Sequence, residues 1–107
     1  MMANFLLLYQ GGKMPESEAE QQRFLKEWEK WFASMGSGVV DGGNPTTPVA
    51  KNITAEGKVS DVPAVSMVSG YSIIKADSLD AAVALAKRCP VLKGGASVMV
   101  FETFNAM

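Results

Sequence analysis

The sequence contains no histidine and a single cysteine, Cys89, among its 107 residues. Without histidine there is no His-ligated metal site, no Ser-His-Asp or Cys-His catalysis, and no histidine pH switch. One cysteine cannot form an intrachain disulfide, so nothing in the sequence indicates an oxidising compartment. The carboxylates are not at ligand spacing in any recognised loop. We therefore expect neither a metal nor another cofactor.

The chain also lacks an excess of charge and a long apolar run. Lys and Arg total 10 against 11 Asp and Glu, giving a net charge of −1. This near-balance excludes the broad basic surface of a dedicated nucleic-acid binder. The apolar run at residues 5–9 is shorter than a signal-peptide core of about 7–15 residues or a membrane span of ~20 residues. We therefore expect a cytoplasmic protein with neither nucleic acid nor membrane as partner.

What is present fits one small globular domain over residues 1–107. Hydrophobic residues make up 48% of the chain and charged residues 20%, which argues against global disorder. The length lies near the common domain size of roughly 100–150 residues. It leaves no room for a separate catalytic domain beside a binding domain.

Short apolar segments and helical patterns alternate along the chain. Strands are predicted at four segments: residues 4–9, 39–41, 67–76 and 97–101. A minor hairpin is predicted around Glu56-Gly57, and Gly70 within the third segment marks a bulge or a close backbone approach. The second helix begins at Ser78, carries Lys87 and Arg88 in its last turn and is stopped by Pro90. The order βαββαβ predicts a ferredoxin-like α+β fold, with a four-stranded antiparallel sheet and two helices on one face.

The first helix is the clearest single element. Ser17 and Glu20 form a capping-box pattern, although Pro15 could instead occupy the first helical position, and Gly36 suits the C-terminal cap. Its apolar stripe comprises Phe24, Leu25, Trp28, Trp31, Phe32 and Met35. An aromatic stripe at helical spacing normally faces the core, so we favour packing over a ligand box. Trp28, flanked by most of the stripe, is expected to be the more deeply buried tryptophan.

The strands are apolar on both faces. Phe5, Leu7 and Tyr9 point to one side of the first strand, and Leu6 and Leu8 point to the other. Two helices cover only one side of such a sheet, and a large bare apolar face is uncommon on a monomer. The sequence therefore predicts a homodimer in which the sheet faces of two copies pack together.

The order and spacing of several segments resemble the YCII-related family, which includes the "DGPF" proteins. The run Gly-Ser-Gly-Val-Val-Asp-Gly at residues 36–42 is similar to the family's helix end and first loop. Asp-Val-Pro-Ala at 61–64 resembles a degraded D-G-P-F, and residues 70–82 resemble the Gly-Tyr strand and the helix start that follows it. The resemblance covers nearly the whole chain. It implies a ferredoxin-like, dimeric α+β barrel.

The departures from the family bear on catalysis. Family members whose residues suggest catalysis carry a histidine on the first helix. The corresponding position in this chain is Phe24 or Leu25. Where relatives often have His or Asp before the proline that ends the second helix, this chain has Cys89. The last strand lacks the Glu-x-Arg pattern. The resemblance therefore does not supply the family's acid/base residues.

Two aspartates are candidate catalytic residues. Asp61, matched to the family motif, could act as a general base or bind a ligand. We favour a structural role in which Asp61 bonds backbone amides before Pro63, as Asx turns do. Asp41 ends a strand beside two glycines, so it could line a pocket mouth or form an ordinary Asp-Gly turn.

Other polar residues are candidate ligand-binding residues. Tyr9, Tyr71 and Glu102 lie near strand ends, where phenols and a carboxylate could converge in a pocket, although strand pairing could leave them far apart. Arg23 could reach a ligand carboxylate, or pair with Glu20 or Glu27 at the surface. Cys89 has no partner histidine and ends an apolar helical stripe, so we interpret it as a small buried hydrophobe.

Three functional hypotheses remain. The first is a non-catalytic, dimeric small-molecule-binding or scaffold protein, favoured because the sequence offers no activated nucleophile. The second is a small enzyme, such as a lyase, isomerase or dehalogenase-like hydrolase acting on a small organic acid or phenol. The third is a protein-interaction or regulatory module that uses an exposed sheet edge.

Overall fold

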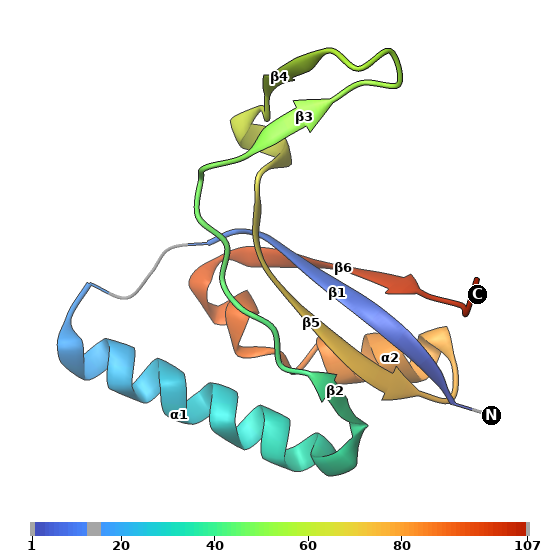
Figure 1. Cartoon of the computed structure of the whole chain (residues 1–107). Coiled ribbons are helices and arrows are strands. Elements are labelled where there is room, and N and C mark those ends of the chain that lie inside the picture. Colours follow the sequence, from blue (N-terminus) through green and yellow to red (C-terminus); the bar gives the residue numbers. More distant parts are fainter. Residues whose placement is uncertain (1, 13–15, 107) are drawn as a thin grey trace.

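The computed structural model describes residues 2–12 and 16–106, so Pro15 lies outside the described residues. The described strands are β1 (Ala3–Gly11), β2 (Val39–Asp41), β3 (Lys51–Ile53), β4 (Val59–Asp61), β5 (Val68–Ala76) and β6 (Ala96–Glu102). The helices are α1 (Glu18–Met35) and α2 (Leu79–Ala86). A four-stranded antiparallel sheet has the order β2-β5-β1-β6, and β3 pairs with β4 in a separate hairpin. The predicted ferredoxin-like α+β fold is confirmed (Figure 1).

Both helices begin at the predicted caps. The Ser17 hydroxyl accepts a hydrogen bond from the Glu20 amide at 3.1 Å, and the Ser78 hydroxyl accepts one from the Ala81 amide at 3.1 Å. These caps satisfy amides that have no carbonyl partner in the first turn. At the end of α1, Gly36 has a φ of +54° and its amide donates to the Phe32 carbonyl, which fits the predicted glycine cap.

Helix α2 is shorter than predicted. It ends at Ala86, and the Arg88 and Cys89 amides donate to carbonyls only three residues earlier. Pro90 disfavours helical backbone at the residue before it, so the last turn tightens and the α-helix stops early. A 3₁₀ helix over Pro90–Gly94 follows. The prediction that Lys87 and Arg88 lie in the last turn of the α-helix is therefore wrong.

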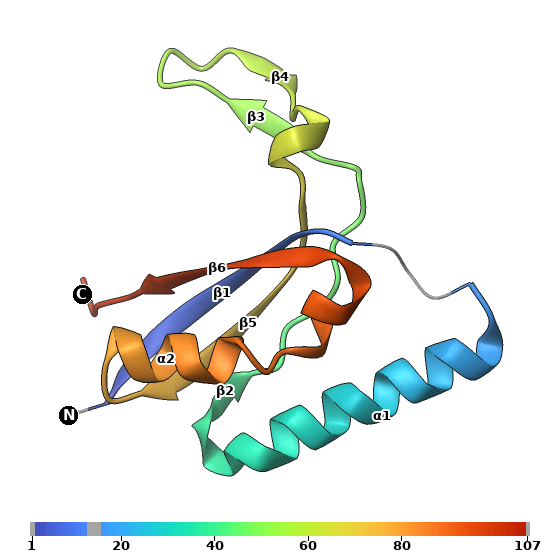
Figure 2. The same ribbon diagram turned by 180° about the vertical axis from the view of Figure 1, so that it is seen from behind.

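The core lies on one face of the four-stranded sheet. Phe5, Leu7 and Ile74 are fully buried there. Helix α1 contributes Trp31 to this cluster, and α2 contributes Ala82 and Ala86. Both helices therefore cover the same face, and Figure 2 shows α2 lying across the strands on that side.

The relative depth of the two tryptophans is the reverse of the prediction. Trp31 is only 5% exposed and its indole Nε1 donates to the Leu85 carbonyl at 3.1 Å, whereas Trp28 is half-buried. The cause is the position of α2, whose Leu85 carbonyl meets the Trp31 indole toward the C-terminal end of α1. Figure 2 shows the N-terminal end of α1 far from α2.

The β3–β4 hairpin is confirmed and forms an arm that stands away from the main sheet (Figure 1). All of its residues from Lys51 to Asp61 are exposed. The radius of gyration is 15.2 Å, above the roughly 13 Å of a compact domain of similar length. The arm and the splayed α1 account for this extended shape.

The burial of the two tryptophans predicts unequal costs of truncation. Trp31→Ala should lower the free energy of unfolding by about 3–5 kcal/mol, because it empties a core site and removes one of the donors to the Leu85 carbonyl, which keeps the Arg88 amide. Trp28→Ala should cost less, because a half-buried ring loses less buried area. Urea melts of both variants measure this, and a larger loss for Trp28→Ala would contradict the packing of α1.

Candidate functional site

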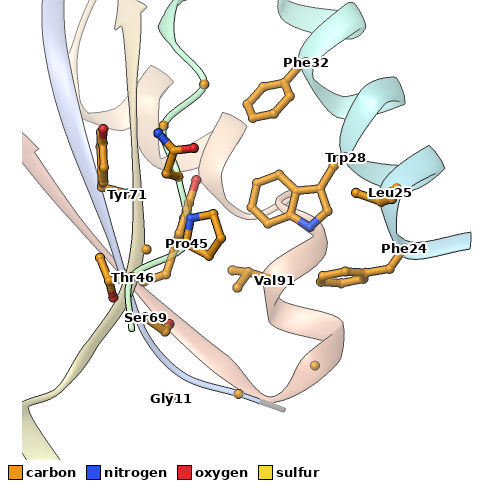
Figure 3. Close-up of a pocket in the computed structure, with 17 residues that line it drawn as sticks. Gly11, Phe24, Leu25, Trp28, Phe32, Pro45, Thr46, Ser69, Tyr71 and Val91 are labelled. Atoms are coloured by element: carbon orange, nitrogen blue, oxygen red, sulfur yellow. The ribbon is translucent and has the colours of Figure 1, made fainter. Parts of the chain in front are cut away.

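A cavity of about 440 Å³ opens between α1 and the edge of the main sheet (Figure 3). Helix α1 contributes Phe24, Leu25, Trp28 and Phe32 to its wall. The opposite wall consists of residues 42–46 after β2 and residues 69–71 of β5, while Tyr9 and Val91 also line the cavity. The volume falls within the range of small-molecule pockets.

Two glycines allow the loop after β2 to lie directly against β5. Gly43 has a φ of +75°, and a Cβ at this position would overlap the Tyr71 carbonyl. Gly70 is buried, and a Cβ there would lie 3.2 Å from the Asn44 carbonyl. The β1–β5 register also shifts next to the Tyr9–Gly70 pair, so Gly70 combines the predicted bulge with the predicted close approach.

Aromatic contacts hold Trp28 in place on the pocket wall. Its ring centroid lies 5.6 Å from that of Tyr9 and 6.0 Å from that of Phe24, both edge-on. The rings of Trp31 and Phe32 each lie 5.6 Å away. Edge-to-face contacts at these distances are favourable. Trp28 therefore joins the hydrophobic core to the pocket.

A buried hydrogen-bond chain runs beneath the pocket. The Tyr9 hydroxyl donates to Ser72 Oγ at 2.7 Å, and Ser72 Oγ donates to the Gly42 carbonyl at 2.8 Å. Burial raises the pKa of Tyr9 above its ordinary 10.0, with a smaller opposing effect from the Ser72 hydrogen bond. Burial also raises the pKa of Cys89 to about 11. Both groups are therefore neutral at pH 7, and neither provides an anionic base or nucleophile.

The structure brings two of the proposed site residues to the pocket. Tyr9 and Tyr71 line it, whereas Asp41 and Asp61 do not. Asp41 accepts a hydrogen bond from the Gly43 amide at 2.8 Å, which is the turn arrangement considered from the sequence. Asp61 lies on the exposed arm and forms an ion pair with Lys51 at 2.6 Å.

Arg23 and Glu102 also lie outside the pocket lining. Glu102 pairs with Phe5, at the end of β1 away from the pocket residue Tyr9, so strand pairing keeps this carboxylate apart from the phenols. Glu27, one partner expected for Arg23, pairs instead with Lys93 at 2.9 Å. Cys89 is only 2% exposed, and its prediction as a small buried hydrophobe is confirmed.

The pocket lining contains no Asp, Glu, Lys or Arg side chain among the described residues. Over those same residues, no three His, Cys, Asp or Glu side chains gather in a way that could hold a metal ion. No helix in the described part of the chain is long and apolar enough to cross a membrane. The walls are aromatic and aliphatic, with the polar residues Asn44, Thr46 and Ser69 at one side.

Sequence reasoning missed the pocket role of Phe24, Trp28 and Phe32. The signal was present, because an aromatic box was the alternative considered for the helical stripe. Deciding between box and core requires the position of α2, which follows α1 by more than forty residues along the chain. Asn44, Thr46 and Ser69 carried no sequence signal beyond that of a loop and a strand.

Comparison with known proteins supports the fold. A solved structure of 5-chloro-2-hydroxyhydroquinone dehydrochlorinase from Burkholderia phenoliruptrix AC1100, in complex with 2,5-dihydroxybenzoquinone, is similar with a TM-score of 0.53. The identity is 17%, and the match covers 94% of this chain and 93% of that one. No protein-family model and no curated protein matches the sequence. The likeness shows the fold alone and is consistent with the YCII-like fold that the sequence resembles.

The buried thiol predicts a loss of stability at alkaline pH. The pKa of Cys89 rises from 9.0 to about 11 on folding, so the folded state holds this proton more tightly than the unfolded chain does. The contribution of the protonated thiol to the free energy of unfolding is fully present below about pH 9 and is lost as pH rises toward 11. Tyr9 acts in the same direction at higher pH. In urea melts, the free energy of unfolding should fall less steeply with rising alkaline pH in Cys89→Ala than in the wild type. Parallel pH curves for the two proteins would contradict this account.

Proposed function

We propose that the chain is a single YCII-related domain that binds a small molecule in the pocket beside α1 and does not catalyse a reaction. The observation that carries this proposal is a cavity of about 440 Å³ with largely apolar walls and a few polar side chains. Ligand sites have this general construction. Trp28 and Phe32 also serve the core, so the aromatic wall is held in place before a ligand arrives.

The chemistry of the lining favours binding over catalysis. Acid/base catalysis requires a group that gains and loses a proton near the working pH. Among the described lining residues, the titratable ones are Tyr9 and Tyr71, and the register places the Tyr71 side chain on the other face of the sheet, with Leu8. Burial makes Tyr9 still harder to ionise, and its proton is already engaged with Ser72. The pocket therefore offers contacts and hydrogen bonds rather than a base.

A small enzyme acting on a small organic acid or phenol is the second candidate. Its support is the structural likeness to a dehydrochlorinase over 94% of this chain. A lyase, isomerase or dehalogenase-like activity would need Tyr9 as its proton-handling group, since the two candidate aspartates lie outside the lining and the register places the Tyr71 side chain on the other face of the sheet, with Leu8. Conversion of a bound phenol in the presence of this protein would favour the enzyme over the binding protein.

We also propose that two copies pack through the uncovered face of the sheet. Register pairs Leu6 with Ile73 and Phe101, and Leu8 with Tyr71 and Met99. Directly opposite residues in antiparallel strands share a face, so these side chains form one apolar surface. Met99 is 37% exposed and Phe101 46% exposed in the single chain. A second copy is the partner whose sheet has the same apolar face.

The binding proposal predicts stabilisation by a ligand from a fragment library. A compound that occupies the pocket should raise the melting temperature, and the rise should grow with its concentration. Leu25→Asp places a charge on the pocket wall at an exposed position and should abolish the rise. Gln22→Asp, an exposed change of equal charge on the same helix, should retain it. Equal responses in both variants would place binding outside this pocket.

The dimer proposal predicts a mass of two chains at micromolar concentration by light scattering. A double variant, Leu8→Glu and Met99→Glu, should scatter as a monomer, because it sets two like charges on paired positions of the apolar face. Ala84→Glu, on an exposed position of α2, is the control and should leave the mass unchanged. A monomeric wild-type protein would overturn the proposal.

A further inference from the structure

The two tryptophans of α1 differ in the partners of their indole N–H groups. The N–H of Trp31 donates to the Leu85 carbonyl at 3.1 Å. The N–H of Trp28 makes no hydrogen bond within the described part of the chain. Every fully buried side-chain nitrogen or oxygen among the described residues has a partner, so the Trp28 nitrogen is not sealed in the core. It is a donor on the pocket wall (Figure 3).

The opposite side of the pocket also carries polar groups. The side-chain amide of Asn44 and the hydroxyl of Ser69 make no hydrogen bond to other described residues, while Thr46 donates to the Val68 carbonyl at 2.5 Å. All three residues line the pocket. A ligand between α1 and the sheet edge would therefore meet a donor at one end and neutral polar groups at the other.

The walls between these ends favour a flat, uncharged molecule. Phe24, Trp28 and Phe32 present rings on one side, and Pro45 stands on the other (Figure 3). The described lining supplies no charged side chain to pair with an ionised ligand. Moving an unpaired charge from water into such surroundings is costly. An anion such as a carboxylate would meet aromatic faces, which are themselves electron-rich.

We propose that the pocket binds an uncharged planar aromatic compound bearing a carbonyl, whose oxygen accepts the hydrogen bond of the Trp28 N–H. This proposal rests on the binding function proposed above and names the class of ligand. Trp28 is suited to the task because four neighbouring rings already fix its orientation, so little further ordering is needed on binding. Trp31, three residues later, has the same chemistry, but its N–H already donates to the Leu85 carbonyl within the fold.

Three probes that share one ring system test the proposal by calorimetric titration. They are 2-acetylnaphthalene, which is neutral and has a carbonyl; 2-isopropylnaphthalene, which lacks the acceptor; and 2-naphthoate, which carries a charge. The ketone should bind about tenfold more tightly than the hydrocarbon, the gain expected of one hydrogen bond. It should also bind at least about tenfold more tightly than the naphthoate, because the pocket has no counter-charge.

Trp28→Phe keeps an aromatic ring and removes the donor. In this variant the ketone should lose its preference over the hydrocarbon, while the hydrocarbon itself should bind within about threefold of its wild-type affinity. Trp31→Phe is the matched control: it removes the donor used in the fold, so it should lower stability and keep the ketone preference. If Trp28→Phe fails to fold, the ranking of the three probes on the wild-type protein still decides the proposal.

The outcomes separate this proposal from the one on which it rests. Naphthoate binding as tightly as the ketone, or a ketone preference that survives Trp28→Phe, would overturn the ligand class while leaving a binding pocket. The ligand class would also be overturned, and the binding pocket retained, if only charged library compounds bind and Leu25→Asp weakens their binding. Failure of every probe and every library compound to bind would overturn both.

Discussion

The hydrogen bond from Trp31 to the Leu85 carbonyl, with the burial of the Trp31 ring, determines how α1 sits in this molecule. Trp31 is the one buried residue among the eighteen of α1. It ties the C-terminal half of the helix to α2 and to the sheet. The N-terminal end of α1 lies far from α2 (Figure 2). The pocket lies along α1, with Phe24, Leu25, Trp28 and Phe32 on its wall.

The second element of the site is the segment after β2, which contacts β5 at backbone distance. Gly43 and Gly70 permit that approach, and the Tyr9–Ser72–Gly42 chain of hydrogen bonds ties the segment to the interior. Ser72 is fully buried, yet it has both a donor and an acceptor as partners. A satisfied polar chain of this kind specifies one arrangement of the loop, because any shift would leave a buried hydroxyl unpaired.

Local signals predicted most of the fold because the physics behind them is local. A serine side chain reaches amides two or three residues away, so Ser17 and Ser78 mark helix starts wherever the rest of the chain lies. Alternation along a strand likewise separates Phe5 and Leu7 from Leu6 and Leu8 without knowledge of the neighbours. Gly70 was predicted to mark a bulge or a close approach because few other roles suit glycine in a strand.

The orientation of α1 and the position of the pocket could not be predicted in this way. The stripe spans Phe24 to Met35 and is apolar along its whole length, so its pattern does not say which end contacts the core. The deciding contact joins residues 54 positions apart, Trp31 and Leu85, through a backbone carbonyl that has no sequence signature. Glu102 shows the same limit, since only the register of β6 on β1 reveals its distance from Tyr9.

The arm formed by β3 and β4 gives the chain a region that can change without disturbing the rest. Its strands pair with each other, and its turn at Thr54–Gly57 is closed by its own hydrogen bonds. Exposed loop tips of small and polar residues tolerate insertions and are the first sites that proteases cut. Length variation during evolution, or a fused peptide, can therefore be accommodated at this turn while the sheet, both helices and the pocket keep their contacts.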